Sequence, residues 1–374
     1  MDFGQGILAA VSKSSNASKE LADDGKNILF IDHNSFTIFF NSTECRLKLS
    51  EKAMDTLSQL NEFDVVEFYA DDRFRIVYED CPDGATLFVT NQCNSNCIMC
   101  PCSIPSRRQR DTISVNRLCD YLEYMPTDIR HLVITGGEPT LIRKDMFRIL
   151  QKIRGHFEDF THYLFLTNGR AFSSQWYLNQ FMENAPQNLY FGIPLYGYSA
   201  ETHDPITQTP GSFAQTVYGL KGLLSYGCNI ELRIVVSKLN LAYMDQLASF
   251  IGSELRGINR VNIMATEMMG AAARNRELVW VDYAESFKAS KQAIQTLMSA
   301  GIDVSLYNFP LCKVEPGYWS LCAKSISSYK IQYYDSCQEC EVRELCGGVF
   351  RSTLALEKMV LTPVKGRGEV RQHA

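Results

Sequence analysis

Short apolar runs alternate with longer stretches of helical periodicity through the middle of the chain. The runs are rich in β-branched residues and lie at 85–90, 131–135, 163–167, 189–195, 230–236 and 260–266. In the stretch after each run, apolar residues recur every three or four positions, which is typical of an amphipathic helix. Strands joined by helices pair in parallel with the helices outside the sheet. The pattern therefore predicts an α/β fold in which strand–helix units form a curved parallel sheet, a partial barrel of six units.

The helices that follow these runs have recognisable ends. We expect them at 114–124, 144–155, 174–184, 212–226, 243–255 and 282–300. Several begin with Ser or Asp, whose side chains cap the first backbone N–H groups of a helix. Gly155, Gly227 and Gly301 follow predicted helix ends, where a left-handed residue is favoured.

The two ends of the chain differ from this repeating middle. We expect three domains: a small α+β module at 1–84, the partial barrel at 85–305, and a C-terminal segment with a tail at 306–374. Residues 1–26 are polar and predict a frayed or weakly helical start. Further on, the module has β-prone runs at 28–31, 37–40, 65–69 and 73–78. It also has a helical stretch at 50–60 and a hairpin turn at Asp71-Asp72. The module either supports the barrel or offers a sheet edge to a leader peptide.

Composition excludes several classes of function. The chain has 374 residues with 45% hydrophobic and 21% charged residues, which describes an ordinary soluble protein. There is no run of about 20 apolar residues, so we expect no membrane span, and the start of the chain resembles no export signal. We therefore expect a cytoplasmic protein. The net charge of −5 gives no basic footprint for nucleic acid. A local exception is Arg107, Arg108 and Arg110, interpreted as a solvated loop or as a contact for an acidic substrate.

Thirteen cysteines in a large chain without an export signal indicate metal or redox chemistry rather than disulfides. Three of them, Cys93, Cys97 and Cys100, lie on one loop directly after the run at 85–90. At this spacing three thiolates can converge on a four-iron, four-sulfur cluster and leave the fourth iron without a protein ligand. An iron with an open position is a place for chemistry, so this loop is the first candidate site.

A second motif follows the next strand. Gly136-Gly137-Glu138-Pro139 combines two residues without side chains, which admit a ligand against the backbone, with a carboxylate able to bind an ammonium group. Thr167-Asn168-Gly169 follows the third strand in the same way. In barrels of parallel strands the carboxyl ends face the active site. We therefore expect all three loops at one mouth of the barrel.

These motifs make the chain resemble the radical S-adenosylmethionine (SAM) superfamily. The resemblance implies that Cys93, Cys97 and Cys100 carry the cluster, that its open iron chelates SAM, and that residues 136–139 hold the methionine ammonium. It further implies reductive cleavage of SAM to a 5'-deoxyadenosyl radical, which removes a hydrogen atom from the substrate. Many members have an aromatic residue before the third cysteine. Met99 stands there in this chain, and its polarizable thioether can pack on a purine.

A second cysteine set lies near the end of the chain. Cys337, Cys340 and Cys346 are spaced to wrap one metal centre, and Cys312 would complete four thiolates, with Cys322 as the rival for the fourth position. Spacing alone leaves zinc and an iron–sulfur cluster as alternatives. Beside the first motif, this segment resembles the auxiliary-cluster ("twitch" or SPASM-like) domain of peptide-modifying radical SAM members, which implies a second [4Fe-4S] cluster.

Longer stretches, among them LFVTNQCNSNCIMC, ITGGEPTLI and CxxCxxxxxCGGVF, resemble the radical SAM maturase family of His-Xaa-Ser systems. The resemblance implies a precursor peptide or small protein as substrate and a reductant such as flavodoxin or ferredoxin. We therefore predict an enzyme that modifies a ribosomally made peptide by hydrogen-atom abstraction. The alternatives are a radical SAM enzyme that acts on a small molecule such as a nucleotide precursor, and a non-catalytic zinc- or cluster-binding protein.

Further residues have weaker predicted roles. Asn168 is predicted to assist SAM binding, and Arg233 to bind the SAM carboxylate or, alternatively, to pair with Glu231 on the same strand face. His203-Asp204 is interpreted as a loop cap or as an acid–base pair. Other candidates are expected to contact ligands or to pack: Tyr196, Tyr198, Glu267, Arg274 and Arg276. The remaining cysteines are read as small buried hydrophobes, and His131 and His162 as structural.

Overall fold

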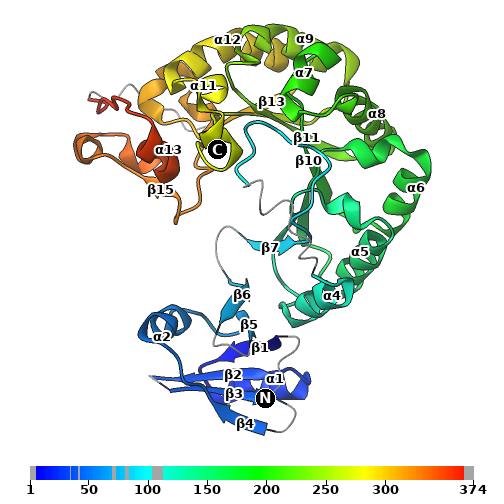
Figure 1. Ribbon diagram of the computed structural model, residues 1–374, viewed down its shortest axis with the longest axis vertical. Coiled ribbons are helices and arrows are strands. Elements are labelled where there is room, and N and C mark those ends of the chain that lie inside the picture. Colours follow the sequence, from blue (N-terminus) through cyan, green and yellow to red (C-terminus); the bar gives the residue numbers. More distant parts are fainter. Residues whose placement is uncertain are drawn as a thin grey trace.

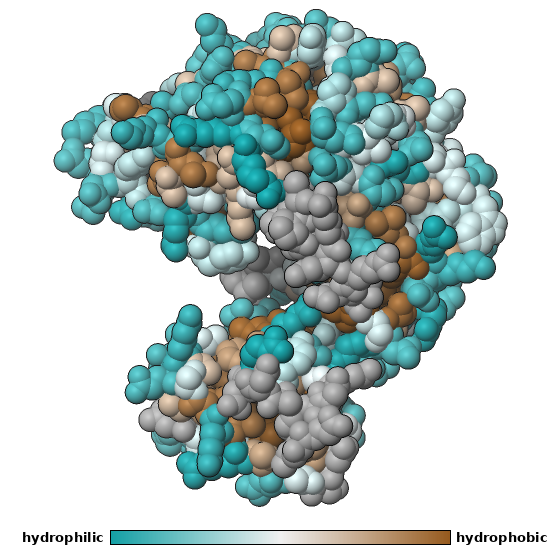
Figure 2. Space-filling view, in the orientation of Figure 1, coloured by the Kyte–Doolittle hydropathy of each residue, from teal (hydrophilic) through white to brown (hydrophobic). Residues whose placement is uncertain are grey.

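A computed structural model describes residues 6–33, 35–40, 43–69, 73–80, 84–102 and 113–365. The chain forms an N-terminal sheet with two helices, a large curved sheet with helices along its outer side, and a small C-terminal segment at the far end of the arc (Figure 1). Hydrophilic side chains cover most of the described surface in this view (Figure 2).

The large sheet is built of parallel strands in the order β14-β13-β12-β11-β10-β9-β8-β7. Its strands are β7 Ala85–Phe88, β8 His131–Thr135, β9 His162–Leu166, β10 Leu189–Pro194, β11 Asn229–Val235, β12 Arg260–Met264, β13 Asp303–Tyr307 and β14 Cys322–Ala323. The predicted α/β fold with a parallel sheet is confirmed. The sheet also continues beyond the six predicted strands: β13 and β14 extend it into the C-terminal segment, so the boundary expected after residue 305 lies within β13.

Helices connect the strands and cover the outside of the sheet (Figure 1). They are α4 Val115–Tyr124, α5 Asp145–His156, α6 Gln175–Asn184, α7 Ala200–Thr207, α8 Ser212–Ser225, α9 Met244–Glu254, α10 Ala271–Arg274, α11 Arg276–Val279 and α12 Tyr283–Ser299. Ser114 and Asp282 cap helices as predicted. Gly227 and Gly301 have φ of 70° and 76°, the left-handed conformation expected after a helix. The prediction for Gly155 was wrong, because α5 continues through it.

The N-terminal module is a mixed sheet in the order β4-β3-β2-β1-β5-β6. Its elements are β1 Ile7–Ser12, α1 Ser15–Asp23, β2 Ile28–Asp32, β3 Ser35–Phe40, β4 Thr43–Arg46, α2 Glu51–Ser58, β5 Val65–Phe68 and β6 Phe74–Tyr78. The start was predicted to be frayed or weakly helical; within residues 6–26 it is not frayed, and the helical alternative holds for α1 alone. The run at 7–12 is an inner, largely buried strand, and α1 begins at a Ser14 cap. The hairpin turn predicted at Asp71-Asp72 lies outside the described residues.

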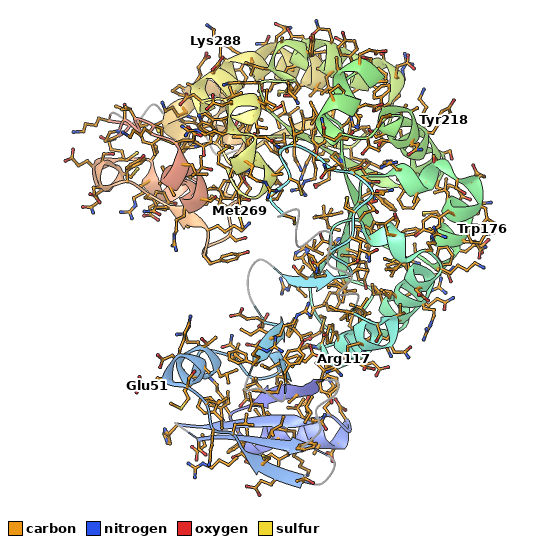
Figure 3. The ribbon with its side chains drawn as sticks, in the orientation of Figure 1. Glu51, Arg117, Trp176, Tyr218, Met269 and Lys288 are labelled. Carbon is orange, nitrogen blue, oxygen red and sulfur yellow. The ribbon has the colours of Figure 1, made fainter. Side chains whose placement is uncertain are left out.

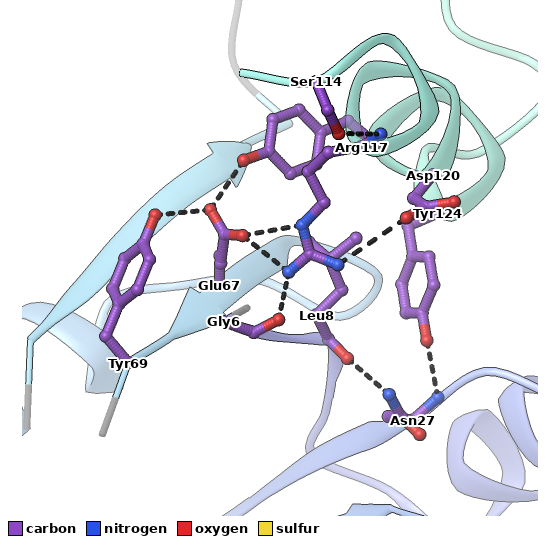
Figure 4. Close-up of polar contacts among 10 residues, drawn as sticks. Gly6, Leu8, Asn27, Glu67, Tyr69, Ser114, Arg117, Asp120 and Tyr124 are labelled. Atoms are coloured by element: carbon purple, nitrogen blue, oxygen red, sulfur yellow. Dashed lines mark hydrogen bonds and ion pairs between the residues drawn. The ribbon is translucent and has the colours of Figure 1, made fainter. Parts of the chain in front are cut away.

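A buried ion pair fixes this module to the barrel (Figure 4). The Glu67 carboxylate on β5 accepts hydrogen bonds from Arg117 Nε on α4, at 2.7 Å, and from the hydroxyls of Tyr121 and Tyr69, each at 2.6 Å. Burial alone would raise the pKa of Glu67, but these donors outweigh it and lower that pKa. Arg117 also donates to the carbonyl of Gly6. The module is thereby anchored on the helix after β7.

The C-terminal segment consists of short elements. They are η4 Leu311–Lys313, η5 Pro316–Leu321, β15 Ile331–Gln332, η6 Asp335–Glu339, η7 Arg343–Leu345, β16 Val349–Phe350 and α13 Arg351–Leu356. The strands β15 and β16 pair with each other in antiparallel fashion. Across the described parts of the chain, no helix combines the length and the apolar character needed to cross a membrane.

Candidate functional site

The loop with Cys93, Cys97 and Cys100 leaves the carboxyl end of β7 and is held by backbone contacts on two sides. On one side Asn96 N–H donates to the carbonyl of Thr207 at 2.9 Å, and Ile98 N–H donates to that of Ile206 at 3.0 Å. On the other side Ala271 N–H donates to the carbonyl of Cys100 at 2.8 Å, and the Asn275 side chain donates to that of Ile98 at 2.9 Å. Backbone from the connections after β10 and β12 therefore fixes the path of the cysteine loop.

The connection after β12 that contacts the cysteine loop through Ala271 and Asn275, here called the clasp, requires a glycine. Gly270 has φ of 59°, and a Cβ at this position would lie 2.1 Å from the carbonyl oxygen of Pro101. Its neighbour Met269 lies on the inner edge of the arc, whereas Trp176, Tyr218 and Lys288 lie along the outer side (Figure 3). The cysteine loop and its clasp thus occupy the concave side of the sheet.

Gly136 and Gly137 make a second close contact with the beginning of the cysteine loop. A Cβ on Gly137 would lie 2.3 Å from the Gln92 carbonyl oxygen, and one on Gly136 would lie 2.5 Å from that of Thr90. Gly137 N–H donates to the Thr90 carbonyl at 2.7 Å. The side of each glycine where a Cβ would stand is filled by protein backbone, and their contact with a ligand stays a prediction. The glycines allow two motif loops to lie directly against each other.

Glu138 is buried, with 1% of its surface exposed. Its carboxylate accepts hydrogen bonds from Thr140 N–H at 3.1 Å, Thr167 Oγ1 at 2.7 Å and Asn168 N–H at 2.6 Å. Burial raises the pKa of Glu138, and these hydrogen bonds oppose the rise. In this arrangement the carboxylate ties the loop after β8 to the loop after β9, and Pro139 begins the 3₁₀ turn that follows, η1 Pro139–Ile142.

Asn168 also contacts the cysteine loop. Its side-chain amide donates to Asn94 Oδ1 at 2.7 Å, and its Oδ1 accepts the backbone N–H of Arg170 at 3.0 Å. Arg170 Nη1 donates to the carbonyl of Asn94 at 2.7 Å and to Ser95 Oγ at 3.1 Å. The sequence reasoning missed Arg170. The signal was present in its position directly after Asn168-Gly169 at the end of the third strand.

One tyrosine, Tyr196, lies within electrostatic reach of the three cysteines of the loop. Burial raises the pKa of Tyr196 well above its usual value, and negative charge on Cys97, Cys100 and Cys93 would raise it further, whereas Arg233 lowers it. Tyr196 packs against Ile98 and Met99, the two residues between the second and third cysteines. All three thiols and the Arg233 guanidinium are therefore within electrostatic reach of a single phenol at the mouth of the barrel.

A pocket of about 220 Å³ adjoins this region. Its lining combines the cysteine loop, the carboxyl ends of β11–β13 and the C-terminal segment, and includes Met99, Pro101, Arg233, Glu267, Tyr307, Ser327, Lys330 and Phe350. Arg233 Nη1 pairs with Glu231 Oε1 at 3.0 Å, which is the alternative that the sequence left open. Met99 is 5% exposed and packs against Tyr196 and Met268.

The second cysteine set converges on a separate, apolar pocket. Cys312, Cys337, Cys340 and Cys346 line it together, and Cys322 does not. Burial raises the pKa of Cys312 to about 11, with smaller contributions from Cys346, Cys337 and Cys340. Backbone N–H groups already point at two of these sulfurs: Leu311 N–H lies 3.4 Å from Cys346 Sγ, and Val364 N–H lies 3.4 Å from Cys340 Sγ.

Other predicted residues have structural partners. Asp204 accepts from the N–H groups of Gly211 and Phe213 at 2.6 and 2.8 Å, which confirms the loop-cap interpretation. His203 is 1% exposed, and burial lowers its pKa to about 4. Arg276, expected near ligands, pairs instead with Glu357 on the C-terminal segment at 2.6 Å.

Thiolates are the usual protein ligands of iron–sulfur clusters, so both donor sets suit such clusters in kind and number. Within the described ranges, no three His, Cys, Asp or Glu side chains are arranged to hold a single metal ion. The assignment of metal ligands among the cysteines therefore stays a prediction.

Part of the chain matches the model of a known protein family. Residues 87–251, which contain the cysteine loop, the 136–139 motif and Arg233, match the model of the Radical SAM superfamily. The match covers less than half of the chain and agrees with the parallel α/β fold described above.

Two curated relatives match part of the chain. An uncharacterised protein of Methanocaldococcus jannaschii is 25% identical over 173 residues, which cover 44% of this chain and 57% of that protein. An AdoMet-dependent heme synthase of Methanosarcina barkeri is 26% identical over 154 residues, which cover 41% of this chain and 42% of the enzyme. Each match thus covers less than two thirds of the relative.

Solved structures with similar folds include Streptococcus suis SuiB bound to its precursor peptide SuiA. It has a TM-score of 0.47 and 11% identity, and the match covers 73% of this chain and 69% of SuiB. A radical SAM methyltransferase from Sphaerobacter thermophilus has a TM-score of 0.43 and 13% identity, with 65% of this chain and 72% of that chain covered.

Proposed function

We propose that the protein is a radical SAM enzyme that modifies a ribosomally made peptide or small protein. The observation that supports the radical part is that Cys93, Cys97 and Cys100 lie on one short loop whose backbone is held from both sides at the carboxyl ends of the strands. A rigid loop matters because a cofactor displaced by an ångström loses much of its catalytic effect.

In this proposal the three thiolates hold a [4Fe-4S] cluster with one open iron. When bound, the reduced cluster supplies the electron that cleaves SAM, and the resulting 5'-deoxyadenosyl radical takes a hydrogen atom from the substrate. The chain's own residues bind and orient. Gly136, Gly137, Glu138, Pro139 and Asn168 would fix the loops around the SAM site, Met99 would pack against the adenine, and Arg233 would supply a cation for the SAM carboxylate.

The second cysteine set holds an auxiliary [4Fe-4S] cluster in this proposal. Four thiolates give closed coordination, which suits electron transfer or support of the substrate site more than catalysis at the metal. The shared pocket of Cys312, Cys337, Cys340 and Cys346 favours Cys312 over Cys322 as the fourth ligand. Backbone N–H groups directed at the sulfurs would raise the reduction potential of such a cluster.

A peptide substrate is favoured by the position of the C-terminal segment beside the site. Met99 and Arg233, the proposed SAM contacts, line the pocket of about 220 Å³, and Lys330 and Phe350 of the C-terminal segment line it as well. A substrate that approaches SAM along this wall would contact both cysteine-bearing regions.

The test is anaerobic reconstitution with iron and sulfide, followed by addition of dithionite and SAM. About eight irons per chain and formation of 5'-deoxyadenosine are expected. A loaded protein that forms no 5'-deoxyadenosine would exclude the radical mechanism, and zinc in the second set would exclude the auxiliary cluster. The peptide part is tested by identifying a small open reading frame beside the gene, co-expressing its product with the enzyme and looking for a mass change in that product.

A small molecule is the second candidate substrate. It is favoured by the partial match to AdoMet-dependent heme synthases, whose name describes an enzyme of small-molecule metabolism. Formation of 5'-deoxyadenosine without any mass change in the neighbouring small protein would favour this candidate. In either case we expect flavodoxin or ferredoxin as the reductant.

A further inference from the structure

Asn262 on β12 is buried without a hydrogen bond from its side chain. It is 0% exposed, and both its side-chain oxygen and its side-chain nitrogen lack a partner. Among the residues that the structure describes, it is the only side chain with two buried polar atoms that are both unpartnered. A buried polar group without a partner lowers the stability of a fold, so its presence calls for a functional explanation or for a bound water.

The sheet places Asn262 beside the ion pair of Arg233 and Glu231. Val261 and Ile263, the chain neighbours of Asn262, belong to the core that the sheet forms with its helices. Because side chains alternate along a strand, Asn262 faces the concave side of the sheet. In the register of β11 and β12, Arg233 is the direct partner of Asn262. Adjacent strands lie about 4.8 Å apart, so a rotated guanidinium can reach the amide.

The ion pair itself lies on the other side of Arg233, toward β10. Arg233 Nη1 donates to Glu231 Oε1 at 3.0 Å. A Cβ on Gly192 of β10 would lie 3.2 Å from Glu231 Oε1 and 3.4 Å from Arg233 Cδ. The missing side chain at Gly192 thus provides the space that the pair occupies. The Asn262 amide, on the opposite neighbour strand, is left without a partner.

The Asn262 amide is chemically complementary to both members of the pair. Its oxygen accepts hydrogen bonds and its NH₂ group donates them, whereas a guanidinium only donates and a carboxylate only accepts. When Arg233 turns toward a carboxylate of a ligand, Glu231 loses the donor that it has now. The Asn262 NH₂ group can replace this donor, and the Asn262 oxygen can accept an N–H of the rotated guanidinium.

We propose that Asn262 is a positioning residue for SAM binding and that it acts through Arg233. Arg233 exchanges its contact with Glu231 for the SAM carboxylate, and the Asn262 amide then bridges Arg233 and Glu231. The unpartnered amide is thereby kept for the arrangement in which Arg233 holds the cofactor. The inference rests on the proposed function, which assigns the SAM carboxylate to Arg233.

The first measurement is the thermal stability of the reconstituted full chain without SAM. Asn262→Leu keeps the branching of the side chain and removes the unpartnered amide. We expect its unfolding midpoint to stay level or to rise, by up to about 2 °C.

The matched control is Asn240, which is 1% exposed and has partners for both amide atoms. It accepts from Ser237 N–H at 2.8 Å and donates to the Val235 carbonyl at 3.0 Å. Asn240→Leu should lower the midpoint, because these hydrogen bonds are lost. A fall for Asn262→Leu as large as that for Asn240→Leu would show a structural role, such as holding a buried water, and would overturn the proposal.

The second measurement is the affinity for SAM, determined by equilibrium dialysis against the reconstituted chain. Asn262→Leu should weaken SAM about tenfold with an unchanged iron content. Decarboxylated SAM, which lacks the carboxylate, should bind Asn262→Leu and wild type equally. In an Arg233→Gln background, Asn262→Leu should cause no further loss, because coupled residues are not additive. Equal weakening of both nucleosides, or a tenfold loss that persists in the Arg233→Gln background, would overturn the proposal.

Failure of the proposed function has a different signature. A loaded wild type that forms no 5'-deoxyadenosine would reject that function. A wild type that forms 5'-deoxyadenosine, together with an Asn262→Leu variant of unchanged SAM affinity, would reject only the role of Asn262. The stability comparison needs neither SAM nor turnover, so it judges the unpartnered amide separately.

Discussion

The two cysteine sets are built in opposite ways. The first, Cys93, Cys97 and Cys100, lies on one loop whose backbone is held by connections from distant parts of the barrel, and it lies beside a pocket lined by polar and charged side chains. The second set brings together four thiols separated by up to 34 positions in the chain, within an apolar pocket. The surrounding barrel fixes the backbone of the first set. In the proposal, the metal centre bound by the second set would instead fix the C-terminal segment around it.

This difference separates chemistry from support. A site that leaves a ligand position open needs its geometry fixed by the rest of the protein, because the bound group does not close the structure by itself. A site with four thiolates closes on its metal and contributes folding energy to a segment with few regular elements. We therefore expect the two sets to respond differently to substitution.

Removing one ligand from each set should have the largest effect. Cys97→Ala should lower the iron content by about four per chain and abolish 5'-deoxyadenosine formation, because the catalytic cluster loses a ligand. Cys337→Ala should lower the iron content by a similar amount but retain cleavage of SAM. Iron analysis and chromatography of the nucleoside products measure both effects. Loss of SAM cleavage in both variants would show that the sets do not act separately.

The second-largest effect is expected from displacing the backbone of the loop that carries the first cysteine set. Gly137→Ala places a methyl group 2.3 Å from the Gln92 carbonyl oxygen and must displace the start of the cysteine loop. We expect 5'-deoxyadenosine formation to fall about 100-fold, with the second set still loaded.

The matched control for this change is Gly155→Ala within α5. A Cβ there meets nothing within 4 Å, so the variant should be as active as wild type and slightly more stable, by about 0.5–1 kcal/mol. Equal activity of Gly137→Ala and wild type would refute the close packing of the two motif loops.

A change far from both sets should affect stability alone. Glu67→Gln removes the carboxylate that anchors the N-terminal module and leaves Arg117 buried without its charge partner. We expect a loss of about 3 kcal/mol in the free energy of unfolding at neutral pH, with both iron sites retained. Denaturant titration of the reconstituted protein measures it.

The same residue gives a pH dependence. The pKa of Glu67 is lowered in the folded state relative to its usual value of 4.5. Its stabilising contribution is therefore complete above about pH 4.5 and is lost as pH falls through the lowered pKa. The stability difference between wild type and Glu67→Gln should shrink in that acidic range. A difference that stays constant down to the lowest pH would contradict the anchoring role.

The smallest effect is expected from the contact that joins the two regions. Arg276 follows the loop that clasps Cys100, and it pairs with the largely buried Glu357 of the C-terminal segment. Arg276→Gln should cost about 1–2 kcal/mol and modestly slow loading of both clusters. Thermal unfolding and the time course of reconstitution report on it. Unchanged loading of both sets would mean that the regions fold independently.

Much of the fold follows from local pattern. The strands β7 to β12 coincide closely with apolar runs, because alternate residues of these strands are buried, as the burial patterns of β8 and β11 show. The strands β1, β4 and β13 to β16 were not predicted. β14 has two residues and no pattern of its own, and β1 is a short run beside polar residues whose burial depends on β2 and β5.

The candidate site could likewise be predicted from local motifs only in part. The cysteine spacings and the Gly-Gly-Glu-Pro motif identified the regions that meet at the mouth of the barrel. The hydrogen bonds of Glu138 with Thr167 and Asn168 and the pairing of Arg276 with Glu357 depend on partners 29 to 81 positions away in the chain. A single sequence does not specify which distant partner a charged residue will meet.

The central claim is that three thiolates hold a cluster with one iron open to SAM. Electron paramagnetic resonance of the reduced Cys337→Ala variant tests it directly, since that variant retains only the first cluster. We predict a [4Fe-4S]⁺ signal whose g-values shift when SAM is added, as expected when a ligand binds the open iron. A signal that SAM leaves unchanged, or the absence of any cluster signal in the iron-loaded variant, would contradict the account.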